Sequence, residues 1–167
     1  GLGPDVEGII LIGYHCAAGV AGSTLAHTLF PNIIKEMRIN GEIASEFLIH
    51  YYIALERRIP ILLVTGDQAL IDQVKQVSPA TVGIAEKVML TDGSVIHKPF
   101  ETVLEEIKTG AERAYEQTWH LPSMPEAFQL EVTFVNTSKA HTASFYPGAK
   151  QQGEDLVVFT SEKYEEL

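Results

Sequence analysis

Two histidines and two carboxylates are the residues of this chain whose types and spacing could carry chemistry. His15 and Asp67 each follow an apolar run of strand length, and His27 closes the small-residue loop that begins after His15. Glu46 falls in the first turn of a predicted helix, where the helix dipole favours an ionised carboxylate. Ligands collect at the carboxyl ends of strands in open α/β sheets, so these side chains could converge there. Imidazole nitrogens and carboxylate oxygens are ligands that zinc accepts.

Each of these residues also has an ordinary structural role that its position allows. A histidine after a strand is most often a polar loop residue, and Glu46 could simply satisfy a helix N-terminus. Asp67, after Gly66, could be a turn or cap residue. Cys16, beside His15, could line a site, but its type favours a small buried side chain in the core. Spacing alone therefore leaves both the metal site and the structural roles open.

The elements that must position these residues alternate between strands and helices, which predicts an α/β fold. We expect a mainly parallel or mixed sheet with helices packed on it, and C-terminal strands that complete a smaller sheet. Residues 1–121 would form the core with the metal-site half, and residues 122–167 would pack on it or form a small subdomain. Predicted strands are 8–13 and 61–64, buried on both faces, then 33–39, 81–90, 94–97, 130–134 and 156–159. Predicted helices are 46–58, with Ser45 as its N-cap and apolar nearly all round, and 68–77. A third helix begins at Pro99, and its apolar face consists of Phe100, Val103, Leu104, Ile107, Ala111, Ala114 and Tyr115.

Composition narrows the classes of protein that this chain could belong to. Its 167 residues are 46% hydrophobic and 20% charged, which is enough apolar material for a folded core. A net charge of -10 with only 12 Lys and Arg residues argues against nucleic-acid binding. One cysteine excludes an internal disulfide and a zinc cluster of cysteines. There is no apolar run of about 20 residues and no signal peptide, so we predict a cytoplasmic protein that does not contact a membrane.

The order of several motifs resembles the DppA-like D-aminopeptidase family, over almost the whole chain. The motifs are Gly13-Tyr14-His15, Ala26-His27-Thr28, Ile39-Asn40-Gly41, Ser45-Glu46, the run 59–67 that ends in Thr65-Gly66-Asp67, Glu86-Lys87, Tyr146-Pro147-Gly148-Ala149 and 156–159. The resemblance implies a two-zinc metallopeptidase that removes N-terminal D-amino acids from short peptides. By position, it implies that His15 and Glu46 are zinc ligands and that His27 is catalytic, as nucleophile or general base. Asp67 lies in a family segment near the site and is a candidate for substrate or cofactor binding.

The chain also departs from the family pattern, which places an Asp-x-Glu pair and another histidine well before Gly13-Tyr14-His15. Asp5-Val6-Glu7 does not replace that pair, because an extended strand of about seven residues separates Glu7 from His15 by about 20 Å. Gln68 stands where relatives often have a second Asp. We therefore expect this chain to supply only part of a two-zinc ligand set and to have little or no activity alone. An N-terminal segment or a second chain would complete the site.

Two hypotheses about function follow. The favoured one is a zinc-dependent aminopeptidase that acts on short peptides by metal-assisted amide hydrolysis. The alternative is a non-catalytic α/β scaffold or assembly module that has lost part of the metal site. A dinucleotide-binding domain is a weaker option, because the first strand is not followed by the Gly-x-Gly-x-x-Gly turn. The strongly apolar helix 46–58 also suggests contacts with other chains, so we expect a homo-oligomer.

Overall fold

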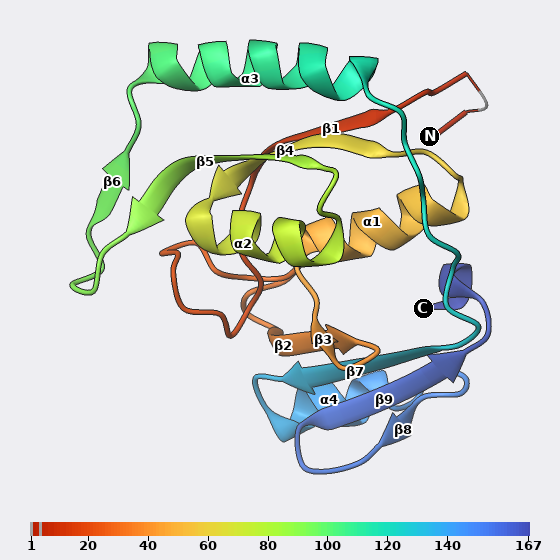
Figure 1. Ribbon diagram of the computed structural model, residues 1–167. Coiled ribbons are helices and arrows are strands. Elements are labelled where there is room, and N and C mark those ends of the chain that lie inside the picture. The colour runs from red at the N-terminus through yellow and green to blue at the C-terminus, as the bar shows by residue number, and fades with distance from the viewer. Residues whose placement is uncertain (1, 4) are drawn as a thin grey trace.

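The computed structural model describes residues 2–3 and 5–167 and arranges them around two β-sheets (Figure 1). The strands are β1 (Ile9–Tyr14), β2 (Ile34–Ile39), β3 (Glu42–Ile43), β4 (Ile61–Asp67), β5 (Val82–Met89), β6 (Val95–His97), β7 (Phe128–Phe134), β8 (Lys150–Gln151) and β9 (Leu156–Ser161). The helices are α1 (Glu46–Glu56), α2 (Gln68–Val77), α3 (Phe100–Glu116) and α4 (Thr137–Ala143), with a final 3-10 turn η1 (Tyr164–Glu166). This confirms the predicted α/β fold with helices packed on a mixed sheet.

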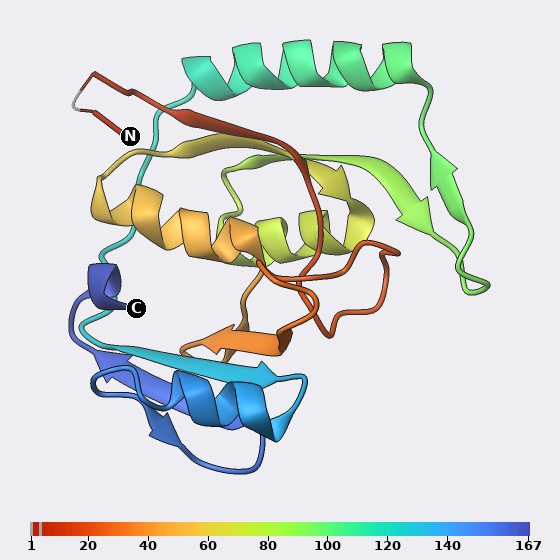
Figure 2. The ribbon, with the colours of Figure 1, turned by 180° about the vertical axis from the view of Figure 1, so that it is seen from behind.

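The first sheet has the strand order β1-β4-β5-β6. β1, β4 and β5 are parallel, and β6 returns antiparallel to β5 as the second strand of a hairpin. Because parallel strands need a crossover, α2 connects β4 to β5 and packs on the sheet. The views from front and back agree that α3 covers one face of this sheet while α1 and α2 cover the other (Figures 1 and 2).

Strand β1 differs from its prediction. Its apolar run indicated burial on both faces, yet Ile10 and Ile12 are 45% and 54% exposed. β1 lies at the edge of the described sheet, and α3 packs on Leu63 of β4 and on Val82 and Ile84 of β5. The face of β1 that bears the two isoleucines is therefore left uncovered within the part of the chain described.

The second sheet is antiparallel, with the order β3-β2-β7-β9-β8. The predicted turn at Asn40-Gly41 joins β2 to β3, with positive φ angles of 52° and 82°, as a two-residue type I′ hairpin requires. The C-terminal strands complete this sheet as expected, and β2 and β3 from the first part of the chain belong to it as well. With five strands against four, it is not the smaller sheet that was predicted. A division of the chain at residue 121 stays a prediction.

Helix α1 lies between the two sheets and is buried within this chain. Ser45 caps it as predicted, accepting a hydrogen bond from Leu48 N at 3.2 Å. Tyr52 of this helix packs against Phe128 of β7 and Tyr164 of η1, with ring centroids 5.5 and 5.3 Å apart. Since its apolar surface is used inside one chain, the composition of α1 no longer argues for contacts with other chains.

Helix α3 meets the sheet over a narrower face than its sequence pattern indicates. Gly110 and Ala114 are buried, but Phe100, Leu104 and Tyr115 are 70%, 47% and 71% exposed. Phe100, Leu104 and Tyr115 therefore lie outside the contact with the sheet, which includes Gly110. A Cβ at that position would lie 3.1 Å from side-chain carbons of the strands below it.

Among the described residues, no helix is both long and apolar enough to cross a membrane.

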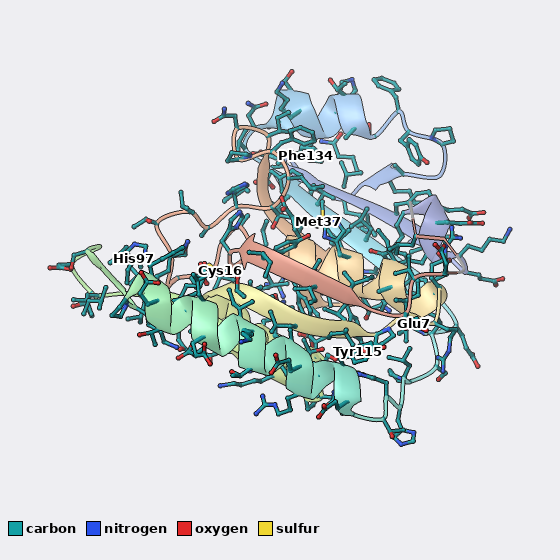
Figure 3. All side chains as sticks on the ribbon, turned by 90° about the horizontal axis from the view of Figure 1, so that it is seen from above. Glu7, Cys16, Met37, His97, Tyr115 and Phe134 are labelled. Atoms are coloured by element: carbon teal, nitrogen blue, oxygen red, sulfur yellow. The ribbon has the colours of Figure 1, made fainter. Side chains whose placement is uncertain are left out.

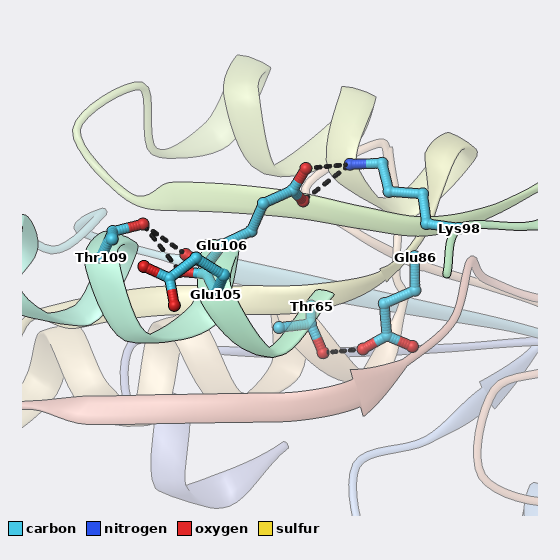
Figure 4. A network of polar contacts seen from close by, with 6 residues as sticks. All are labelled: Thr65, Glu86, Lys98, Glu105, Glu106 and Thr109. Carbon is cyan, nitrogen blue, oxygen red and sulfur yellow. Dashed lines mark hydrogen bonds and ion pairs between the residues drawn. The ribbon is translucent and has the colours of Figure 1, made fainter. Parts of the chain in front are cut away.

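The exposed end of the first sheet is held to α3 by an ion pair between Lys98 and Glu106, whose nearest atoms are 2.7 Å apart (Figure 4). Exposed pairs of this kind contribute little to stability, about 0 to 1 kcal/mol.

Candidate functional site

The four predicted site residues come from one loop, one strand end and one helix start: His15 and His27 lie on the loop after β1, Asp67 ends β4, and Glu46 begins α1. The loop that joins β1 to β2 lies beside the end of β4 and the start of α1 (Figures 1 and 2). It carries both His15 and His27, whose ring centroids are 4.1 Å apart with the planes tilted by 34°. The structure therefore brings the two histidines together, although twelve positions separate them in sequence.

The two imidazole rings are oriented by backbone carbonyls. Nδ1 of His15 lies 3.2 Å from the carbonyl oxygen of Cys16, and Nδ1 of His27 lies 2.8 Å from that of Leu25. A carbonyl oxygen only accepts hydrogen bonds, so each Nδ1 is the donor and carries a hydrogen. Each Nε2 is then the nitrogen with a lone pair, which can bind a metal or take a proton. Metal-ligating histidines are commonly oriented in this way.

Glu46 is joined to the histidine loop through the backbone. Its Oε1 accepts a hydrogen bond from Leu29 N at 3.1 Å, two residues after His27. A carboxylate has a second oxygen that can bind a cation while the first holds this contact. Leu29 has a φ of 57°, a left-handed conformation that costs a non-glycine residue roughly 1–2 kcal/mol. Such strain persists where surrounding contacts hold the backbone, as Glu46 does here.

Tyr14 links the end of β1 to α1 beside this site. Its hydroxyl lies 2.8 Å from Nδ1 of His50, which is one helical turn after Glu46. Burial raises the pKa of the Tyr14 hydroxyl, and the negative charge of Glu46 acts in the same direction. Tyr14 is therefore a neutral hydrogen-bonding group at physiological pH, and it holds His50 in place.

Asp67 is 1% exposed and uses both oxygens on backbone N–H groups. Oδ1 accepts from Leu70 N at 2.9 Å, which caps α2, and Oδ2 accepts from Cys16 N at 2.9 Å. Its carboxylate therefore ties the start of α2 to the residue that follows His15. Binding of substrate or cofactor by Asp67 stays a prediction, and the observed contacts are structural.

Cys16 is a core residue, as its type indicated. It is 2% exposed, and burial raises the pKa of its thiol to about 11, with the Asp67 carboxylate contributing in the same direction. The thiol is thus protonated at physiological pH and is not poised for nucleophilic attack.

Two buried threonines were not singled out by sequence reasoning. Thr65 Oγ1 accepts from Gly13 N at 2.9 Å and donates to the Glu86 carboxylate (Figure 4). Thr28, next to His27, is fully buried and makes two hydrogen bonds to distant backbone atoms. Both lie inside the motifs that resemble the family. Their type and spacing, however, do not indicate that their hydroxyls are buried and bonded to distant backbone atoms.

The donors present fit part of a zinc ligand set. The chain offers imidazole nitrogens of His15 and His27 and a carboxylate oxygen of Glu46, which are zinc ligands by chemistry. Among the described residues, however, no group of three or more His, Cys, Asp or Glu side chains is placed to hold one ion. Figure 3 places Glu7 and Cys16 at opposite ends of β1, so Glu7 does not approach His15.

The chain thus combines a mixed α/β fold with two paired imidazoles at the carboxyl end of β1. The chain belongs to the D-aminopeptidase family, peptidase M55, which matches it over residues 1–167. This confirms the resemblance seen in the sequence motifs. Among curated proteins, none matches this chain.

A solved structure to which this chain is similar has the same fold. It is the Zn-dependent D-aminopeptidase DppA from Bacillus subtilis, described as a self-compartmentalizing protease. The two chains superpose with a TM-score of 0.83 at 20% sequence identity. The match covers 95% of this chain and 58% of DppA, so this chain spans somewhat more than half the length of that protein. At this identity the likeness establishes the fold.

Proposed function

We propose that this chain is part of a zinc-dependent aminopeptidase that releases N-terminal D-amino acids from short peptides by metal-assisted amide hydrolysis. The observation that carries the proposal is the contact of the His15 and His27 rings at 4.1 Å, with Nδ1 of each ring committed to a carbonyl. Membership of a peptidase family supports hydrolysis as the reaction class. The zinc dependence of the DppA structure supports the choice of metal.

The residues would divide the work as follows. His15 Nε2 and a Glu46 oxygen would hold zinc, and when bound the metal would supply Lewis-acid polarisation of the scissile carbonyl. His27 would act through Nε2 in one of two ways. It would take a proton from the attacking water, or it would attack the carbonyl carbon itself, with the peptide amine leaving and water then releasing the acyl group from the ring. The Leu25 carbonyl keeps the hydrogen on Nδ1 of His27, so its Nε2 is ready to accept a proton. Asp67 would orient the loop that carries His15, and any contact with substrate would add to that role.

A complete two-zinc site would need ligands beyond those of the described residues. An N-terminal segment or a second chain would supply them, and the isolated chain would then have little or no activity. The description of DppA as self-compartmentalizing supports a homo-oligomeric assembly. We further propose a cytoplasmic location and short peptides as the substrate class.

The alternative function is a non-catalytic α/β scaffold or assembly module that has lost part of the metal site. One observation favours it: the described residues contain no cluster of three metal-binding side chains. The two proposals differ in a measurable property, which is whether the paired histidines and Glu46 bind zinc.

The test is the zinc content of the purified chain by elemental analysis, with and without prior incubation in zinc. The aminopeptidase proposal expects close to one zinc per chain, abolished in His15→Ala. His120→Ala is the matched control, because His120 is exposed in the segment after α3, outside the loop that carries the paired rings, and its loss should leave the zinc content unchanged. Zinc uptake that is absent, or equal in both variants, would favour the scaffold instead.

The role of His27 needs a separate experiment in a longer chain that includes an N-terminal metal-binding segment. His27→Ala should retain bound zinc there but lose hydrolysis of D-alanyl peptides. Hydrolysis at the parental rate would show that His27 is neither nucleophile nor general base.

A further inference from the structure

Thr28 connects three segments that are distant in the sequence. Its side chain is fully buried, and Oγ1 makes two hydrogen bonds to backbone atoms outside its own loop turn. It accepts from Ala18 N at 3.1 Å and donates to the carbonyl oxygen of Ala44 at 2.7 Å. A hydroxyl can donate one hydrogen bond and accept another at the same time, which a carbonyl or an amide N–H cannot.

The three connected segments are those that carry the candidate site residues. Ala18 follows His15 by three positions, Ala44 precedes Glu46 by two, and Thr28 itself follows His27. A single buried oxygen thus joins the backbone around both histidines to the start of α1. The contact of Leu29 N with Glu46 reinforces the same connection one residue further along.

We propose that Thr28 is a positioning residue, whose hydroxyl holds His27 against His15 at the start of α1. The loop between β1 and β2 is long, and regular backbone pairing does not fix the separation of its two histidines. In the described structure the side-chain bonds of Thr28, Glu46 and Asp67 restrain this loop, and the Thr28 hydroxyl joins the segments of both histidines directly. The placement of the rings can be tested without zinc, while its catalytic meaning rests on the proposed function.

The hydroxyl, and not merely the bulk of the side chain, is what the proposal requires. Thr28→Val keeps the shape but removes donor and acceptor together, leaving Ala18 N and the Ala44 carbonyl buried without this partner. Thr28→Ser keeps the hydroxyl and removes only a methyl group. Thr81→Val is the matched control, because Thr81 is also buried and donates to the carbonyl of Ile61 at 2.8 Å, at the start of β4.

The experiment measures the nuclear Overhauser cross-peak between the ring protons of His15 and His27 in isotope-labelled protein without zinc. We expect the cross-peak in the parent, in Thr28→Ser and in Thr81→Val, and its loss in Thr28→Val. A cross-peak of equal strength in Thr28→Val and Thr81→Val would overturn the proposal. Should Thr28→Val fail to fold, Thr28→Cys replaces it, since a thiol of serine-like shape is a weak hydrogen-bonding group. Equal cross-peaks in Thr28→Ser and Thr28→Cys would then overturn it.

Zinc titration of the same variants separates this inference from the proposed function. Weaker zinc binding in Thr28→Val than in Thr81→Val, restored in Thr28→Ser, is expected if both hold. If the cross-peaks follow the hydroxyl and none of the proteins binds zinc, positioning by Thr28 stands and the zinc peptidase fails. If every variant binds zinc equally and keeps its cross-peak, the positioning role fails while the zinc site stands.

Discussion

Removal of the Asp67 carboxylate is the perturbation whose effect follows most directly from the observed contacts. In Asp67→Ala, Leu70 N loses its helix-capping partner and Cys16 N loses its acceptor. The loss of a cap costs about 1 kcal/mol. A hydrogen bond to a charged group contributes about 1.5–3 kcal/mol, and the N–H of Cys16 is left buried. The two contributions give an expected loss of about 3 kcal/mol in the free energy of unfolding.

Asp67→Asn separates these two contributions. Asparagine is also a good N-cap residue, so its oxygen can still accept from Leu70 N. Its amide NH2 group would then face the N–H of Cys16, which puts two donors together. We therefore expect Asp67→Asn to retain the cap but lose the connection to the loop that carries His15, at a cost of about 2 kcal/mol.

Urea unfolding measures both variants. With a slope of about 2 kcal/mol/M, the expected losses lower the urea midpoint by about 1.5 M for Asp67→Ala and about 1 M for Asp67→Asn. Asp72→Asn is the matched control, because Asp72 is exposed on α2 and contacts only Gln68 among the hydrogen bonds found. The reasoning would be refuted if the urea midpoints of Asp67→Ala and Asp72→Asn differed by less than about 0.2 M, which corresponds to about half a kcal/mol in the free energy of unfolding.

Two further predictions concern the alkaline stability of the core and the approach of α3. Burial raises the pKa of Tyr164, and Tyr52 and Glu56 act in the same direction. The contribution of this residue to the free energy of unfolding is therefore complete below the unfolded pKa of about 10. Above that pH it falls, by at most about 1.4 kcal/mol per pH unit. Tyr164→Phe removes the hydrogen bond to the Ile49 carbonyl and should lower the free energy of unfolding by about 1 kcal/mol at pH 7. Above pH 10 the stability of this variant should decline less steeply than that of the parent. Plots of urea midpoint against pH that run parallel for the two proteins would contradict this. Gly110→Leu should push α3 from the sheet and lower the free energy of unfolding by about 1–3 kcal/mol. The control Lys108→Leu, at an exposed position of the same helix, should not. Equal thermal midpoints for the two variants would argue against close packing at Gly110.

Part of the fold could be predicted because the relevant chemistry is local. The Asn40-Gly41 turn, the Ser45 cap and the span of α2 each depend on residues within a few positions of one another. Helix α4 and strand β8 escaped prediction because they are short and mostly polar. The seven residues of α4 begin at an Asn136 cap, without the apolar periodicity that marks a longer helix.

The candidate site divides in the same way. Residue type and motif order selected His15, His27 and Glu46 as candidates, and their roles stay predictions. The ring contact shows that the two histidines lie together. The use of both Asp67 oxygens by backbone N–H groups was not predictable, because Cys16 N and Leu70 N reach it from two separate segments. A sequence pattern indicates which groups need partners, but not which partners the fold will bring.

The sequence by itself therefore determined the α/β class, the order of its longer elements, its family and the types of side chain available for chemistry. These properties follow from periodicity, capping and turn signals that act over a few residues. Only the tertiary structure decided that Ile10 and Ile12 stay exposed, that α3 rests on Gly110, and that Thr28 joins the histidine loops to α1. Each of these features depends on which strand lies at the edge of a sheet or on contacts between segments far apart in the chain. Local propensity determines neither of them.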